Sequence, residues 1–107
     1  MEVQLVTGDL LFGSKVESMI REAGCTPVGG GASAADITVL DLTEQGIDVA
    51  AVVGQARIGS EPVLAYYAHT DDDVRRAAIE AGVEKIVPRS RMMREGAELI
   101  RGLLPGQ

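Results

Sequence analysis

The sequence predicts an α/β fold in which a doubly wound, five-stranded parallel sheet is covered by helices on both faces. Short apolar runs alternate along the chain with longer segments whose apolar residues recur every three or four positions, as expected where strands alternate with helices. Two runs, DITVLDL (36–42) and PVLAYYA (62–68), are apolar nearly throughout, which is typical of strands buried on both faces. The length of 107 residues suits one domain over residues 1–107.

The other three strands are shorter. In EVQLVT (2–7), apolar and polar side chains alternate, which indicates a strand with two different faces. CTPV (25–28) is predicted as the second strand and EKIVP (84–88) as the fifth.

Two helices are predicted in the first half of the chain. The first has a single apolar face and is ended by Gly24. Its apolar positions are Phe12, Val16, Met19, Ile20 and Ala23. The second helix is predicted over EQGIDVAAVVGQA (44–56). No helix is expected between the second and third strands, because GGGASAA (29–35) leaves room for a turn at most.

Two further helices are predicted in the second half. Thr70 is expected to cap the third helix, and the carboxylates of Asp71–Asp73 suit the positive end of its dipole. Gly82 ends that helix. Ser90 is expected to cap the last helix, which continues to about Leu104.

Composition and charge narrow the classes of function. The formal net charge of −6 argues against binding to nucleic acid or to an anionic membrane surface. With one cysteine, Cys25, and one histidine, His69, an internal disulfide or a Cys/His metal cluster is not expected. No apolar run approaches the roughly 20 residues of a membrane span, and the first residues lack the pattern of a signal peptide. A cytoplasmic protein is therefore expected.

The segment VTGDLLFGSK (6–15) nearly matches a phosphate-binding loop. Gly8 and Gly13 have the required spacing, but Ser14 and Lys15 stand in the reverse of the order that such a loop needs. The segment is better explained as a turn between a strand and a helix.

Polar residues gather where the predicted strands end. Ligands of open parallel sheets bind at the carboxyl ends of the strands. The residues expected there are Thr7, Gly8 and Asp9, then Asp41, then Tyr67, Ala68 and His69, and finally Pro88 and Arg89. A carboxylate after a central strand and a cation after the last strand suggest an anion-handling pocket, in which Arg89 would be a partner for Asp41.

Two segments resemble the receiver domains of bacterial response regulators. They are ADITVLDLTEQGID (35–48) and PVLAYYAHTDDDVRRAAIEAGVEKIVPRS (62–90). The resemblance covers the chain except residues 25–35. It implies a flavodoxin-like fold with strand order 2-1-3-4-5, and it places Asp41 where receivers accept a phosphoryl group.

The other signature positions depart from the receiver pattern. Thr7 and Gly8 occupy the places of the two metal-binding acids, and only the next residue, Asp9, is acidic. Tyr67 stands where receivers carry a small hydroxyl residue, and Arg89 stands in the place of their lysine. Mg²⁺ prefers several hard oxygen ligands, so Asp9 and Asp41 would make a weak metal site, and ordinary phosphotransfer is disfavoured.

The last helix carries two apolar stripes. Met93, Ala97, Ile100 and Leu104 are expected to face the sheet, and Met92, Leu99 and Leu103 form a second stripe beside them. Because a surface helix needs only one apolar face, the second stripe is predicted to contact a partner or a second copy of the chain. Receiver domains often dimerise through this helix, which implies the same.

Three functions fit these observations. The leading hypothesis is a receiver-like signalling or scaffolding module with a degenerate phosphorylation site, which binds a protein partner or itself without enzyme activity or cofactor. The second is a working phosphorelay receiver that uses Asp41, with Asp9 as ligand to Mg²⁺ and Arg89 as the cation. The third is a small-ligand sensor in a crevice lined by Gly8 and the GGGAS loop.

Overall fold

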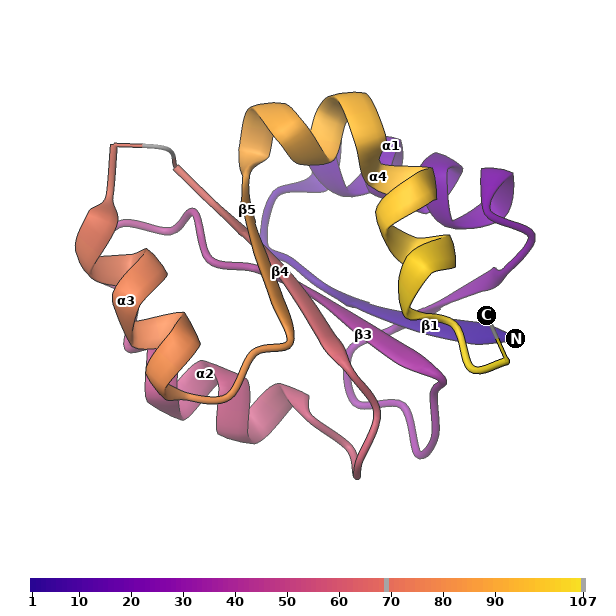
Figure 1. Cartoon of the computed structure of the whole chain (residues 1–107), viewed down its shortest axis with the longest axis horizontal. Helices are drawn as coiled ribbons and strands as arrows, with labels where there is room; N and C mark the ends of the chain where they lie inside the picture. Colours follow the sequence, from indigo (N-terminus) through magenta and orange to yellow (C-terminus); the bar gives the residue numbers. More distant parts are fainter. Residues whose placement is uncertain (69, 107) are drawn as a thin grey trace.

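The computed structural model describes residues 1–68 and 70–106, and its centre is a five-stranded parallel sheet (Figure 1). The strands are β1 (Glu2–Val6), β2 (Thr26–Gly29), β3 (Ile37–Asp41), β4 (Val63–Tyr67) and β5 (Lys85–Pro88). All neighbouring pairs are parallel and the order is β2-β1-β3-β4-β5. The five predicted strands, their direction and the flavodoxin-like order are thus confirmed.

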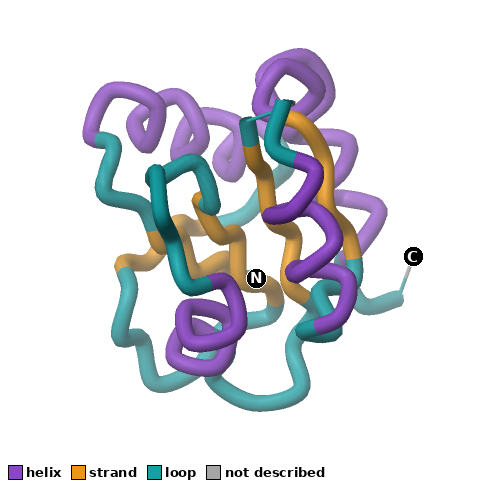
Figure 2. The backbone as a smooth tube through the Cα atoms, turned by 90° about the vertical axis from the view of Figure 1, so that its left-hand side faces the viewer, coloured by secondary structure: helices purple, strands orange, loops and turns teal. Residues whose placement is uncertain are grey.

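Four helices lie in two layers, one on each face of the sheet (Figures 1 and 2). They are α1 (Leu10–Glu22), α2 (Val49–Ala56), α3 (Asp72–Glu80) and α4 (Arg89–Leu103). Helices α1 and α4 pack together over the face that carries Val39, whereas α2 and α3 pack over the face that carries Leu40. The doubly wound arrangement follows from the alternation of side chains along β3, which is buried on both faces.

Aspartates cap three of the helices. Asp9, Asp48 and Asp71 accept hydrogen bonds from backbone N–H groups in the first turns of α1, α2 and α3, respectively. The prediction that Thr70 caps α3 is therefore wrong, and Asp71 takes that place. The prediction for Ser90 is also wrong, because β5 runs directly into α4 and Ser90 lies within the helix.

Helix α2 is shorter than predicted. It begins at Val49 instead of residue 44, and Gly46 before it adopts a positive φ of 75°. That backbone conformation is left-handed and incompatible with a continuing helix. The turn it forms leads to the cap at Asp48.

The connection between β2 and β3 contains no helix, as predicted. Residues 30–36 instead fold against β1, where the backbone N–H of Gly31 donates to the side-chain oxygen of Gln4 at 3.1 Å. Gln4 is 1 % exposed, and its amide also donates to the Thr38 hydroxyl and the Ala56 carbonyl. A buried amide thus ties the glycine-rich loop to the sheet.

Ala97 and Ile100 of α4 face inward as predicted, but Met92 takes the inward place that was predicted for Met93. Met92 is fully buried in the core formed with α1, while Met93 is 43 % exposed. The reason is Gly96, because a β-carbon there would overlap the Met19 side chain of α1. The close approach of the two helices places Met92, Gly96 and Ile100 inward.

The predicted exposed stripe of Met92, Leu99 and Leu103 is therefore not present as a free surface. Met92 belongs to the core, and Leu99 and Leu103 are partly buried against it.

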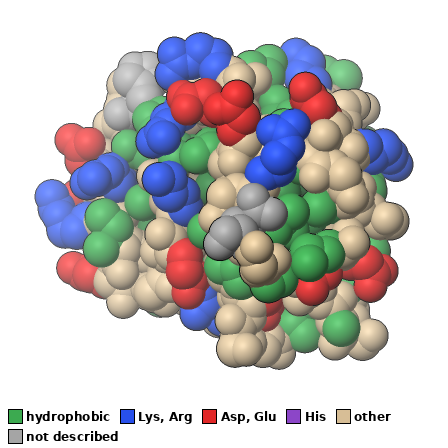
Figure 3. All heavy atoms as spheres, turned by 45° about the vertical axis from the view of Figure 1, so that its right-hand side comes forward, with side chains coloured by type: hydrophobic (Ala, Val, Ile, Leu, Met, Phe, Trp, Pro, Cys, Tyr) green, Lys and Arg blue, Asp and Glu red, His purple; other side chains and the backbone are tan. Residues whose placement is uncertain are grey.

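The distribution of charge is mixed on the side of the molecule that Figure 3 brings forward. Acidic and basic side chains alternate there with apolar ones, so the net charge of −6 is not concentrated on that side. None of the helices in the described ranges is long and apolar enough to cross a membrane. His69, expected at the end of the fourth strand, lies outside the described residues.

Candidate functional site

The site lies at the carboxyl edge of the sheet, where β1 and β3 end side by side. The register pairs Val6 with Leu40, so the next residues of the two strands, Thr7 and Asp41, are neighbours. Asp41 is also the register partner of Tyr66 on β4. This arrangement brings together the predicted residues Thr7, Gly8, Asp9 and Asp41.

Three donors hold the Asp41 carboxylate. One oxygen, Oδ2, accepts a hydrogen bond of 2.5 Å from the Thr7 hydroxyl. The other, Oδ1, accepts from the backbone N–H of Thr43 at 2.8 Å and from the Thr43 hydroxyl at 2.5 Å. Both oxygens of the half-buried carboxylate are therefore engaged by neutral groups of the chain itself.

Asp9 is engaged in two other contacts. Its Oδ1 caps α1 by accepting from the N–H of Phe12 at 3.0 Å, and its Oδ2 lies 3.5 Å from Nη2 of Arg89. The guanidinium of Arg89 also lies over the Phe12 ring, 4.3 Å from its centroid. Arg89 thus pairs with Asp9, and the expectation that it would pair with Asp41 is wrong. Because Arg89 directly follows β5, its contact with Asp9 joins the start of α4 to the start of α1.

The tyrosine of the site is Tyr66, which the sequence interpretation overlooked in favour of Tyr67. Tyr67 points to the opposite face and is buried in the core under α2 and α3. Tyr66 is fully buried against Phe12, with ring centroids 5.1 Å apart, and its hydroxyl has no hydrogen-bond partner among the described residues. Burial, and secondly the negative charge of Asp41, raise the pKa of this phenol. Side chains alternate between the two faces of a strand, so Tyr66 lies on the same face as Leu64, two residues earlier. The pairing of β3 with β4 then places Tyr66 beside Asp41.

An open pocket of about 620 Å³ borders the Asp41 side chain. Its lining consists of Gly8, Asp9, Leu10, Leu11, Asp41, Thr43 and Glu44. Leu10 and Leu11 are 87 % and 84 % exposed, the highest values among the large hydrophobic residues. The pocket thus combines an acidic wall with two apolar side chains that the core does not use.

The residues of this edge do not fit a Mg²⁺ site of the receiver type. Mg²⁺ needs oxygen ligands in near-octahedral geometry, yet Asp9 is committed to a helix cap and an ion pair, and Asp41 to three donors. Within residues 1–68 and 70–106, no group of three or more His, Cys, Asp or Glu side chains could hold a metal. Thr7, which the sequence resemblance placed at one of the two acidic positions of receivers, donates a hydrogen bond to Asp41.

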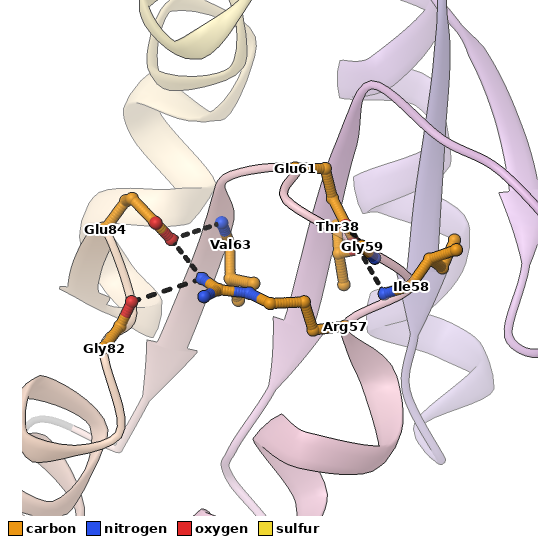
Figure 4. Close-up of polar contacts among 8 residues, drawn as sticks. All are labelled: Thr38, Arg57, Ile58, Gly59, Glu61, Val63, Gly82 and Glu84. Atoms are coloured by element: carbon orange, nitrogen blue, oxygen red, sulfur yellow. Dashed lines mark hydrogen bonds and ion pairs between the residues drawn. The ribbon is translucent and has the colours of Figure 1, made fainter.

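A second carboxylate cluster lies at the opposite edge, in the loop between α2 and β4 (Figure 4). Glu61 is 8 % exposed and accepts from the Thr38 hydroxyl at 2.8 Å and from the N–H groups of Ile58 and Gly59 at 2.8 and 2.7 Å. Burial by itself raises the pKa of Glu61, but these hydrogen bonds outweigh it, so the pKa lies below its usual value. No sequence pattern signalled this cluster.

Arg57 and Glu84 form a separate pair beside that loop (Figure 4). The guanidinium also donates to the Gly82 carbonyl at 3.2 Å, and Glu84 accepts from the N–H of Val63 at 2.9 Å. These contacts join the end of α2 to the segment before β5, so they stabilise the amino edge of the sheet.

No model of a known protein family matches the sequence, and no curated protein matches it either. Solved structures, in contrast, match over nearly the whole chain. A signal receiver domain of a histidine kinase from Clostridium thermocellum has a TM-score of 0.76 at 12 % identity and covers 97 % of each chain. The receiver domain of the putative response regulator NarL from Mycobacterium tuberculosis has a TM-score of 0.72 at 21 % identity, covering 99 % of this chain and 97 % of its own.

A third similar structure is the receiver domain of the sensor histidine kinase PA1611 from Pseudomonas aeruginosa, which holds a magnesium ion in its active-site cleft. Its TM-score is 0.73 at 16 % identity, with 95 % of each chain covered. The resemblance predicted from residues 35–48 and 62–90 is thus confirmed by the three-dimensional structure. The chain has the fold of response-regulator receiver domains.

Proposed function

We propose that the chain is a receiver-like signalling or scaffolding module that acts by binding a protein partner or a second copy of itself. In this proposal, Asp41 is not phosphorylated in the ordinary way, no catalytic residue or cofactor is needed, and the protein works in the cytoplasm. The domain spans residues 1–107.

One observation carries the proposal: Asp41 is held by Thr7 and Thr43, while Asp9 is held by Phe12 and Arg89. A phosphoryl group adds a charge of about −1.5 or more, and a divalent cation is the usual means of neutralising it. The hydroxyl groups beside Asp41 supply no positive charge. The fold shared with receiver domains supports a signalling role, and the engagement of Asp9 and Asp41 by groups of the chain itself supports binding over phosphotransfer.

Incubation with acetyl phosphate and Mg²⁺, followed by intact mass measurement, tests the proposal. We expect no phosphoryl adduct on the natural chain. The double variant Thr7→Asp/Gly8→Asp restores acids at the two receiver positions and should gain an adduct, and that adduct should disappear when Asp41→Asn is added. The gain of function shows that the assay can detect phosphorylation in this fold.

The working phosphorelay receiver remains the second candidate, because Asp41 lines an open pocket at the edge where receivers are phosphorylated. An adduct on the natural chain that is absent from Asp41→Asn would establish this function and overturn the first proposal.

A further inference from the structure

Leu10 and Leu11 stand out from the rest of α1. The helix buries Phe12, Gly13, Val16 and Ile20, whereas these two leucines remain more than four-fifths exposed. Phe12 and Gly13 in the same turn point into the core, so Leu10 and Leu11 lie outside the inward face of the helix and the core gains nothing from their side chains. Single exposed apolar residues are ordinary, but adjacent ones at the wall of a pocket indicate a contact surface.

The ionisable side chains that line the pocket beside these leucines are all acidic. The ionisable residues that line the pocket are Asp9, Asp41 and Glu44, and Glu44 is exposed at its rim. Arg89 offsets only Asp9. An apolar pair beside uncompensated carboxylates is complementary to a surface that places Lys or Arg next to large apolar side chains.

We propose that this pocket binds a basic amphipathic segment of a partner protein. The apolar side chains of the segment cover Leu10 and Leu11, and its Lys or Arg side chains lie beside Asp41 and Glu44. A second copy of the chain is a poor occupant, because a symmetric contact would bring the same carboxylates together. This inference rests on the proposed function, since it names the partner surface of a binding module.

The probe is a synthetic peptide of Leu and Lys whose sequence forms an amphipathic helix. It is titrated into the 15N-labelled protein, and the amide signals of the protein are followed by NMR. A scrambled peptide of the same composition controls for charge alone. We expect the amphipathic peptide to shift the amide signals of Leu10, Leu11, Thr43 and Glu44 and to bind more tightly than the scrambled one. The double variant Leu10→Ser/Leu11→Ser should weaken binding at least about tenfold, as for central residues of an interface.

The matched control is the double variant Ile79→Ser/Met93→Ser, which changes two large apolar residues that are exposed on other helices. Ile79 lies on α3 and is 50 % exposed, and Met93 lies on α4 and is 43 % exposed. This control variant should bind the peptide as the natural chain does. Circular dichroism should show both double variants to be folded, because none of the four side chains is buried.

Three results would overturn the inference. They are equal binding by the scrambled peptide, unchanged affinity of Leu10→Ser/Leu11→Ser, or self-association in sedimentation that this variant abolishes, which would make a second copy the occupant. The acetyl phosphate experiment decides the proposed function separately, so failure here leaves that result standing.

Discussion

Asp41 and Glu61 lie at opposite edges of the same sheet and are held by the same kinds of donor. Each carboxylate accepts from threonine hydroxyl and backbone N–H groups, and the threonines lie in β3 or within two residues of the end of β1 or β3. The two differ in access to solvent, because Asp41 lines an open pocket while Glu61 is 8 % exposed.

This difference in solvent access indicates that Glu61 is a structural carboxylate and that Asp41 is a candidate functional one. Water can replace a lost hydrogen bond at Asp41, whereas the Thr38 hydroxyl beside Glu61 is fully buried and would be left without its acceptor. Glu61 also belongs to a longer network, because Thr38 accepts from Gln4, which in turn holds Gly31. The amino edge thus fixes the fold, and the carboxyl edge is free to carry a binding function.

The largest effect is expected for Glu61→Ala. The change removes three hydrogen bonds and leaves the fully buried Thr38 hydroxyl without its acceptor, so the free energy of unfolding should fall by about 3 kcal/mol. Urea denaturation followed by circular dichroism measures it. Glu44→Ala, at an exposed acid, is the control and should change stability by less than about 0.5 kcal/mol. If Glu61→Ala and Glu44→Ala lowered the free energy of unfolding equally, the burial of Glu61 would not make it more important for stability than an exposed acid.

The pH dependence of stability should report the same carboxylate. The pKa of Glu61 lies below its usual value of 4.5, so the folded state favours the charged form. Its contribution to stability is complete above pH 4.5 and is lost as the pH falls through the pKa of the folded state. Urea midpoints of the natural chain and of Glu61→Gln should therefore converge below pH 4.5. A constant difference down to pH 3 would contradict this assignment.

Most of the fold could be predicted because burial leaves a periodic signal. The apolar runs around Val39 and Leu64 identified the central strands, and the glycines after Val28 correctly predicted a missing helix. The inward place of Met92 on α4 could not be predicted, although those of Ala97 and Ile100 were, because the contact with α1 is made through Gly96, which has no apolar side chain to count.

The site was predicted in position but not in its contacts. The strand ends correctly brought Thr7 next to Asp41. The partner of Arg89 was mistaken because the role of Asp9 as a helix cap depends on where α1 begins. Glu61 gave no signal at all, since a loop glutamate is usually exposed and its donors are backbone groups that no sequence pattern reveals.

Asp41→Asn should have a smaller effect than Glu61→Ala. The amide keeps one acceptor oxygen, and water can reach the half-buried position, so we expect a loss of about 1 kcal/mol in the free energy of unfolding. Thermal or urea denaturation at pH 7 measures it. A loss as large as that of Glu61→Ala would mean that Asp41 is also primarily structural, and it would weaken the case for a binding role at the carboxyl edge.

The smallest effect is expected for Tyr66→Phe. The hydroxyl is buried without a hydrogen-bond partner in the described parts of the chain, so its removal costs no hydrogen bond and relieves a desolvated polar group beside Asp41. Stability should stay the same or rise by up to about 1 kcal/mol, measured by urea denaturation. Tyr67→Phe makes the same chemical change on the opposite face and is the matched control. A loss of more than about 1 kcal/mol only in Tyr66→Phe would show that the phenol is hydrogen-bonded in solution. The Asp41 cluster would then extend into the core, as the Glu61 cluster does through Thr38 and Gln4.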